Sequence, residues 1–244
     1  MTNGSALKKP KRFYKTVSVS EGETGWHVEL DGRTPVTPAR RKLALPTQAL
    51  AVSVAEEWEG QIEEIDLPTM TLTRMANVAL DRTPDTRDAL IAEVQKYAGT
   101  DLVCYLAEGP TELRDRQEGH FRPLRDWASR EHGVLLVPTE GVMNAPQPPN
   151  SIEAIGVYAA GKNDFALTGL GMALGLYGSA VLSMAVAEQE LTALDAYDIS
   201  IIDELWQMEQ WGEDEEALQR IGGHRRDALA LGAWFEGLAT GVVA

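Results

Sequence analysis

The stretch FALTGLGMALGLYGSAVLSMAVA, Phe165 to Ala187, decides the fold, because its 23 residues include no charged side chain. A helix of that length can span a bilayer, and Gly171 and Gly175 have the GxxxG spacing of packed membrane helices. However, Tyr177 is the stretch's single interfacial aromatic residue, and acidic rather than basic residues follow it. The central helix of a water-soluble bundle is also apolar on all sides. We therefore predict one buried helix here, without membrane insertion.

The same stretch separates small from large side chains. Its small residues recur every four positions, which is typical of close helix packing: Gly171, Gly175, Ser179, Ser183 and Ala187. The glycines at 169, 171 and 175 resemble a dinucleotide fingerprint only weakly, because they lie inside a helical pattern instead of a turn after a strand. No Walker-type ATP motif occurs in the sequence. We expect no cofactor.

The next segment, Glu188 to Ala217, holds eleven Asp or Glu residues and no Lys or Arg. Periodicity predicts a single helix over Thr192–Trp211, with this core stripe: Leu194, Tyr197, Ile201, Leu205 and Met208. On the helical wheel, Ile202, Trp206, Glu209 and Glu213 gather on one flank. A tryptophan among carboxylates suits a protein-binding surface. The alternative is an ordinary solvated acidic face.

The N-terminal part is predicted to be rich in β-structure. Strands are expected at Phe13–Val19, Trp26–Leu30, Thr34–Thr37 and Lys42–Leu45, with Asp31-Gly32 as a hairpin signal. Thr47 is expected to cap a helix that reaches about Gln61 and buries Leu50, Val54 and Trp58. Helical periodicity dominates afterwards. The predicted fold class is α+β, with a small N-terminal β-rich α/β domain (1–66) that includes one packed helix, followed by a larger all-helical domain (67–244).

Composition limits the function classes. The net charge of −15 argues against nucleic-acid binding, which requires a basic surface. The charge is uneven, since residues 1–42 hold nine Lys or Arg against four acids. The single cysteine, Cys104, excludes an intramolecular disulfide and lies in an apolar run, where a buried thiol is usual.

No pattern of catalytic or metal-binding residues is evident. The four histidines lack metal-ligand spacing, and no HExxH or GxSxG motif occurs. The remaining enzymatic hypothesis is a carboxylate-dependent hydrolase that uses the acidic cluster at 209–216, for example Glu209 with Glu213. Two exposed acids one turn apart lack the burial that separates the roles of such a pair. We therefore do not expect an enzyme.

Several stretches together resemble a known family, the assembly chaperones of the F(1)-ATPase alpha subunit, called ATP synthase mitochondrial F(1) complex assembly factor 2 in eukaryotes. The matching stretches are KRFYK (Lys11–Lys15), LDGRTPVTPARRKLALP (Leu30–Pro46), ALAVSVAEEWEGQ (Ala49–Gln61), DLVCYLAEGPTELRDRQ (Asp101–Gln117) and QMEQWGEDEE (Gln207–Glu216). Each is weak alone, but the combination is specific and spans almost the whole chain.

The resemblance implies a non-enzymatic, soluble holdase whose partner is the free alpha subunit of the F(1) head, shielded until the beta subunit replaces it. It implies a cytoplasmic location for a bacterial form and the mitochondrial matrix for a eukaryotic relative. The chain begins almost at the first family strand, so we expect a bacterial form, and we expect a monomer. The resemblance and the helical flank together predict this partner-binding set: Trp206, Glu209, Gln210, Trp211, Glu213 and Asp214.

Overall fold

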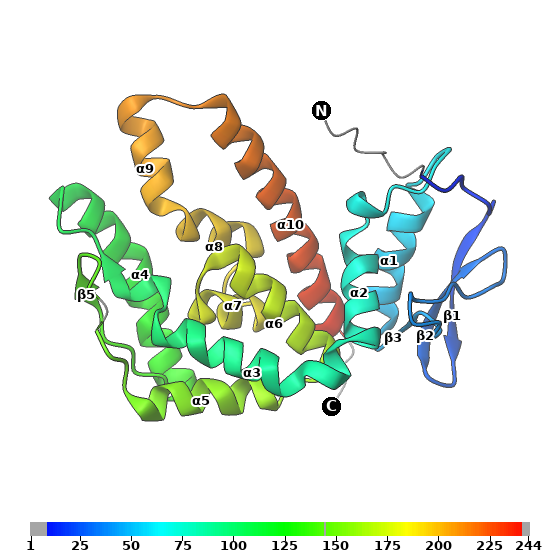
Figure 1. Ribbon diagram of the computed structural model, residues 1–244, viewed down its shortest axis with the longest axis horizontal. Coiled ribbons are helices and arrows are strands. Elements are labelled where there is room, and N and C mark those ends of the chain that lie inside the picture. The colour runs from blue at the N-terminus through cyan, green and yellow to red at the C-terminus, as the bar shows by residue number, and fades with distance from the viewer. Residues whose placement is uncertain (1–8, 144, 241–244) are drawn as a thin grey trace, which may run out of the picture. The chain divides into compact units, whose positions relative to one another are not determined.

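The computed structural model describes residues 9–143 and 145–240, and the chain divides into two compact units. The described residues up to Asp81, together with residues 237–240, form the N-terminal unit, and Arg82–Glu236 form the helical unit. A small β-containing part is followed by many helices (Figure 1). The prediction of an α+β fold with a larger helical part is confirmed.

In the N-terminal unit, a three-stranded antiparallel sheet supports one long helix. The sheet has the order β1-β2-β3, with β1 at Val17–Gly22, β2 at Gly25–Leu30 and β3 at Ala44–Leu45. Helix α1, Gln48–Glu59, packs against β1 and β2. The hydroxyl of Thr47 accepts a hydrogen bond from the Leu50 amide, as predicted for an N-cap. The predicted face of Leu50, Val54 and Trp58 is buried.

The strand predicted at Thr34–Thr37 is wrong. Asp31 and Gly32 do form a tight turn with φ angles of 50° and 75°, and Leu30 and Arg33 exchange backbone hydrogen bonds across it. Pro35 has no N–H to extend that ladder, and the segment pairs onward only through an isolated bridge between Val36 and Lys42. The first strand begins at Val17, later than predicted, because the chain before it runs along the end of α1 instead of along β2.

Glu57 joins α1 to helix α2, Thr71–Asp81, which follows a short 3-10 turn at Leu67–Thr69. Its carboxylate accepts hydrogen bonds from the Leu72 amide (2.7 Å), the Thr73 amide (2.8 Å) and the Thr73 hydroxyl (2.8 Å). These are free amides of the first helical turn, which a carboxylate satisfies well. The burial of Glu57 nevertheless raises its pKa above the ordinary value.

The helical unit has one short helix without charged residues, α7 (Ala180–Ala187), at its centre. The elements of this unit are α3 (Thr83–Gly99), η2 (Leu102–Cys104), β4 (Tyr105–Leu106), α4 (Thr111–His132), β5 (Thr139–Glu140), α5 (Pro149–Ala160), α6 (Asp164–Tyr177), α7 (Ala180–Ala187), α8 (Ala193–Ser200), α9 (Ile202–Trp211) and α10 (Glu215–Ala239) up to Glu236. Helix α7 contacts α3, α4, α6 and α8, and every residue from Ala180 to Val186 is buried. The prediction of a buried central helix is therefore confirmed for this half of the apolar stretch.

The prediction of one continuous helix over the stretch from Phe165 to Ala187 is wrong. Gly178 ends α6 in the left-handed conformation, with φ of 66°, and its amide donates to the Leu174 carbonyl. Ser179 then caps α7, because its hydroxyl accepts a hydrogen bond from the Leu182 amide at 3.0 Å. None of the helices in the described residues is long and apolar enough to cross a membrane.

Asp101 fixes the start of α7 from a distant part of the chain. Its carboxylate accepts hydrogen bonds from the Ser179 hydroxyl (2.5 Å), the Val181 amide (3.0 Å) and the Val103 amide (3.2 Å). Full burial raises the pKa of Asp101 to about 6. Burial also raises the pKa of the neighbouring Cys104 thiol to about 12, so this thiol is inert, as predicted.

The single helix predicted over Thr192–Trp211 is also wrong. It breaks at Ile201, whose φ and ψ of −111° and 23° are not helical, into α8 and α9. The break rotates the second half, so Ile202 is buried, whereas Leu205 and Met208 are half-buried. The predicted core stripe therefore does not continue along one face. The periodic pattern of apolar residues continues through Ile201, so nothing in the sequence indicated the break.

Candidate functional site

Most acidic residues of α8 and α9 are bound within the chain. Asp198 forms an ion pair with Arg225 at 2.6 Å, and Glu204 pairs with Arg220, both on α10. On the other side, the Gln117 amide of α4 donates to Asp203 at 2.6 Å. Because α8 and α9 contain no Lys or Arg, the groups that balance their carboxylates come from α4 and α10.

Glu209 and Trp206, two predicted partner-binding residues, both contact Arg116 of α4. The Arg116 guanidinium donates to both carboxylate oxygens of Glu209 at 2.9 Å. The same guanidinium lies over the Trp206 ring, with its carbon 5.5 Å from the ring centroid. Trp206 is half-buried. These contacts give Glu209 and Trp206 an intramolecular role, in which they hold α9 against α4.

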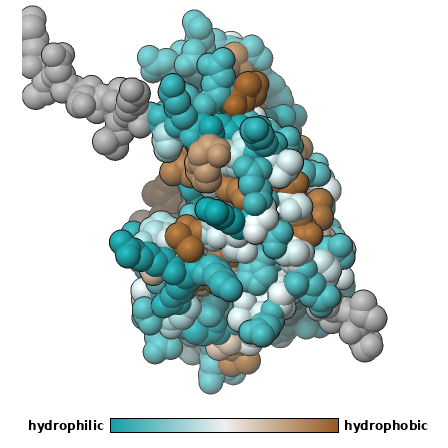
Figure 2. All heavy atoms as spheres, turned by 90° about the vertical axis from the view of Figure 1, so that its right-hand side faces the viewer, coloured by the Kyte–Doolittle hydropathy of each residue, from teal (hydrophilic) through white to brown (hydrophobic). Residues whose placement is uncertain are grey.

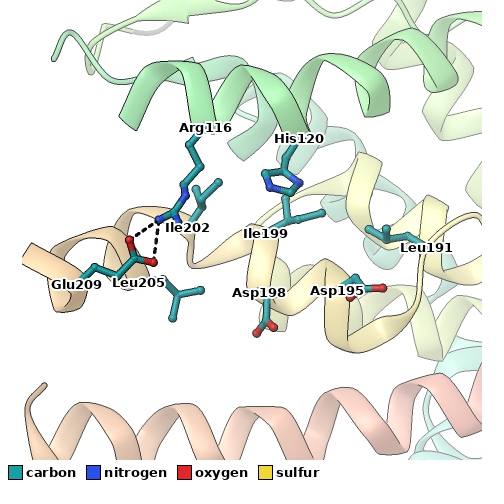
Figure 3. A pocket seen from close by; sticks show the side chains of 9 residues that line it. All are labelled: Arg116, His120, Leu191, Asp195, Asp198, Ile199, Ile202, Leu205 and Glu209. Atoms are coloured by element: carbon teal, nitrogen blue, oxygen red, sulfur yellow. Dashed lines mark hydrogen bonds and ion pairs between the residues drawn. The ribbon is translucent and has the colours of Figure 1, made fainter. Parts of the chain in front are cut away.

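Beside this pair lies a cavity of about 430 Å³, lined from α4, α8, α9 and the segment before α8. Its apolar lining is Leu191, Ile199, Ile202 and Leu205, and its polar lining is Arg116, His120, Asp195, Asp198 and Glu209. Figure 3 shows Arg116 and His120 descending from α4 toward the α8 and α9 side chains. The cavity combines an apolar floor with polar walls, in which Asp198 and Glu209 are already paired with Arg225 and Arg116.

Beyond α9, the carboxylates are no longer paired. We call Trp211–Glu216 the acidic tip; it connects α9 to α10 (Figure 1). Glu213, Glu215 and Glu216 are exposed and form no ion pair with any residue that the structure describes. Asp214 has a structural task, since its carboxylate accepts a hydrogen bond from the Ala217 amide at 3.1 Å and caps α10. Three carboxylates are therefore free to meet a partner.

The acidic tip also carries apolar surface. Trp211 is 79% exposed, and Leu218, one turn into α10, is 42% exposed. Gln210, the remaining predicted residue, is exposed beside Trp211. An exposed tryptophan next to charge is the residue type that dominates many protein interfaces. The tip therefore has both the charge and the apolar anchor of a docking surface.

The geometry lends no support to the hydrolase alternative. Arg116 occupies both oxygens of Glu209, while Glu213 is exposed beyond the end of α9. A carboxylate pair needs different environments to divide acid and base roles. In the described parts of the chain, no three His, Cys, Asp or Glu side chains are placed to hold a metal ion.

Comparisons with known proteins identify the family. The ATP12 chaperone protein family matches residues 11–129. The crystal structure of Atp12 from Paracoccus denitrificans is similar at 38% sequence identity and a TM-score of 0.85, covering 93% of this chain and 97% of that one. This chain belongs to the ATP12 chaperone family. Its role is therefore that of a chaperone in ATP synthase assembly.

Two further solved structures agree. The Atu1473 protein of Agrobacterium tumefaciens has 38% identity and a TM-score of 0.88, covering 94% of this chain and 86% of that one. A variant of the Paracoccus denitrificans Atp12p, with one aspartate changed to lysine, has 38% identity and a TM-score of 0.85, over 93% and 96% of the chains. The family match ends at residue 129, so the acidic tip lies outside it.

Sequence reasoning missed Arg116, His120 and Leu218. A signal for Arg116 existed, because eleven acids without a local cation need a balancing group from elsewhere in the chain. Nothing in the sequence indicated which arginine this is. Leu218 follows the run of acids, so the pattern of apolar residues could not assign it to a buried or an exposed face of the helix.

Proposed function

We propose that this ATP12-family chaperone binds the free alpha subunit of the F(1) head of ATP synthase and prevents its aggregation until the beta subunit takes its place. The alpha subunit packs between beta subunits in the assembled head, so alone it exposes apolar interfaces. The observation that carries the proposal is the acidic tip, with unpaired Glu213, Glu215 and Glu216 beside an exposed Trp211.

The chemistry of the tip favours a partner surface that is basic around an apolar patch. Glu213 is the contact that we assign first, because it is exposed and lies outside both helices. Trp211 and Gln210 are assigned as its neighbours in the contact. Trp206, Glu209 and Asp214 support the tip, since they hold α9 against α4 and cap α10.

Such a chaperone acts through binding alone. A protein that binds the free subunit, but not its aggregate, shifts the equilibrium by mass action. It releases the subunit when a tighter competitor covers the same interface, and we assign this task to the beta subunit. We place the protein in the bacterial cytoplasm, as its relatives from Paracoccus and Agrobacterium suggest, and we propose that it works as a monomer.

Light scattering from purified alpha subunit tests the proposal. Alpha subunit warmed alone is expected to aggregate, and an equimolar amount of this chaperone to suppress the scattering. Later addition of beta subunit should release the chaperone, as detected by size-exclusion chromatography. Unchanged aggregation at a several-fold excess of chaperone would rule out a holdase role for this partner. Suppression that albumin produces equally well would rule out specificity.

A further inference from the structure

The N-terminal unit contains a second open cavity, which the acidic tip does not involve. We call it the N-terminal groove; its volume is about 820 Å³. It lies among the segment from Pro10 to Tyr14, the non-helical segment from Leu30 to Pro38, and residues of α1 and α2. Cavities that hold ligands commonly have this size.

The rim of the N-terminal groove is apolar and open to solvent. Phe13 is 71% exposed, Val36 is 61% exposed and Leu67 is 43% exposed. Beneath them, Leu30, Leu43 and Ile65 are buried and complete an apolar floor. On the face of the molecule drawn in Figure 2, patches of hydrophobic residues lie among hydrophilic ones. Large side chains left exposed around a hollow mark a binding groove more often than scattered exposure does.

The lining of the groove also holds one buried polar atom without a partner in the part of the chain that the structure describes. Trp58 lines it and is 8% exposed, and its indole Nε1 has no hydrogen-bond partner among the described residues. By contrast, the Trp58 carbonyl accepts a hydrogen bond from the Tyr14 hydroxyl at 2.6 Å. A buried donor without an acceptor is costly and needs an explanation. This nitrogen is shielded from solvent, so Trp58 contributes its ring to the apolar floor of the groove.

The two charged residues in the lining favour an acidic occupant. Asp31 is committed within the chain, because its carboxylate accepts hydrogen bonds from the Lys15 amide (3.0 Å), the Thr16 amide (2.9 Å) and the Thr16 hydroxyl (3.0 Å). Those hydrogen bonds lower the pKa of Asp31. Arg33 is exposed and forms no ion pair with any residue in the described part of the chain. Asp31 keeps its negative charge, but its carboxylate is directed at Lys15 and Thr16, so Arg33 is the charged side chain of the lining that remains available to pair with the carboxylate of an occupant.

We propose that the N-terminal groove binds a short extended segment of the same client subunit, in which apolar side chains accompany a carboxylate. The apolar rim accommodates the side chains, and Arg33 pairs with the carboxylate. This inference rests on the proposed function, because it takes the client to be the alpha subunit. A second contact on one client raises the overall affinity above that of either contact alone.

Three variants of the full chain separate this groove from the rest of the surface. The double variant Val36→Asp/Leu67→Asp places carboxylates on the apolar rim, and Arg33→Glu reverses the free charge. The control is Ile62→Asp, because Ile62 belongs to the same unit, is 84% exposed and does not line the groove. All four substituted residues are exposed, and thermal melting checks that each variant folds.

The probe is an array of overlapping short peptides that together cover the F(1) alpha subunit. We expect the wild-type chain to retain peptides that combine apolar and acidic residues. The rim double variant should lose this signal by about tenfold or more, the cost of roughly one good contact. Arg33→Glu should lose it selectively for acidic peptides, and Ile62→Asp should retain it. Equal retention by the rim variant, or no preference for acidic peptides, would overturn the inference.

Capture of the intact alpha subunit distinguishes the two proposals. If the wild-type chain fails to capture it, the proposed function fails, and the groove inference fails with it. If the wild-type chain and the rim variant capture it equally while Glu213→Lys does not, the groove inference alone fails. Weaker capture by both the rim variant and Glu213→Lys, with full capture by Ile62→Asp, supports both proposals.

Discussion

Arg116 and Glu209 form an ion pair between α4 and α9, in which one guanidinium nitrogen of Arg116 lies 2.9 Å from both carboxylate oxygens of Glu209. The side chains are 38% and 50% exposed, so solvent screens the pair. Its consequence is geometrical: α9 is held in place, and the acidic tip at the end of α9 is presented from a fixed helix.

Exchanging the two charges tests this interpretation. Arg116→Glu and Glu209→Arg should each lower the free energy of unfolding slightly, and the double variant should restore it, with a coupling of about 0.2–1 kcal/mol. Client capture should recover in the double variant, since Glu209 positions the tip and does not itself contact the client. Recovery of stability without recovery of capture would assign Glu209 to the interface.

The two tryptophans Trp58 and Trp211 should behave in opposite ways. Trp58 is 8% exposed and Trp211 is 79% exposed. Trp58→Ala should cost about 3–5 kcal/mol, as for other buried aromatic residues, and lower the melting temperature by roughly 10 °C. Trp211→Ala should melt like the wild-type chain and lose client capture. Wild-type melting of Trp58→Ala would contradict its assignment to the core.

Two glycines of α6 give a matched pair for packing. A Cβ at Gly169 would lie 2.7 Å from Phe235 Cζ and 2.9 Å from Trp234 Cδ1, whereas a Cβ at Gly175 would meet nothing within 4 Å. Gly169→Ala should therefore destabilise the chain by about 1–3 kcal/mol. Gly175→Ala should be neutral or stabilising by up to about 1 kcal/mol. Chemical denaturation measures both, and equal effects would refute the close packing at Gly169.

Asp101 should make stability depend on pH in an unusual direction for a carboxyl group. Its pKa rises from 3.8 to about 6 in the folded chain, so the folded state binds the proton more tightly than the unfolded state does. The resulting stabilisation is complete below the unfolded pKa and is lost as pH rises through about 6.

Asp101→Asn removes this contribution and also weakens the hydrogen bonds to α7. The free energy of unfolding of the wild-type chain, relative to Asp101→Asn, should therefore fall between about pH 4 and about pH 7, by of order 2–3 kcal/mol. Comparison of the two chains cancels the titration of other groups. A constant difference across this range would show that the pKa of Asp101 is not raised.

The sequence predicted elements whose signals are local. Thr47, followed by Leu50, Val54 and Trp58, predicted α1 with its cap and its buried face, and the structure confirms all four residues. The break between α6 and α7 also had a local signal, a glycine followed by a serine that caps the next helix. The unbroken apolar pattern concealed it, because hydrophobicity is equal on both sides of the break.

Features that depend on distant residues could not be predicted. The hydrogen bond between Ser179 and Asp101 joins residues 78 positions apart in the sequence, and the ion pair between Arg116 and Glu209 joins residues 93 positions apart. The parallel pair β4–β5 joins two strands of two residues each, too short for any periodicity. At the candidate site, the sequence located the acidic segment, but it could not separate carboxylates that are bound within the chain from those that are free.

The most direct test of the central claim is the affinity for free alpha subunit after charge reversal at the acidic tip. Glu213→Lys should melt within roughly 0.5 kcal/mol of the wild-type chain, because the side chain is exposed and unpaired. Its affinity should fall by about tenfold or more, and further with Glu215→Lys, because attraction to a basic partner becomes repulsion. Glu153→Lys, an equal charge change at an exposed site on α5, is the control and should bind normally. Normal melting with undiminished affinity of the double variant at low salt would contradict the account.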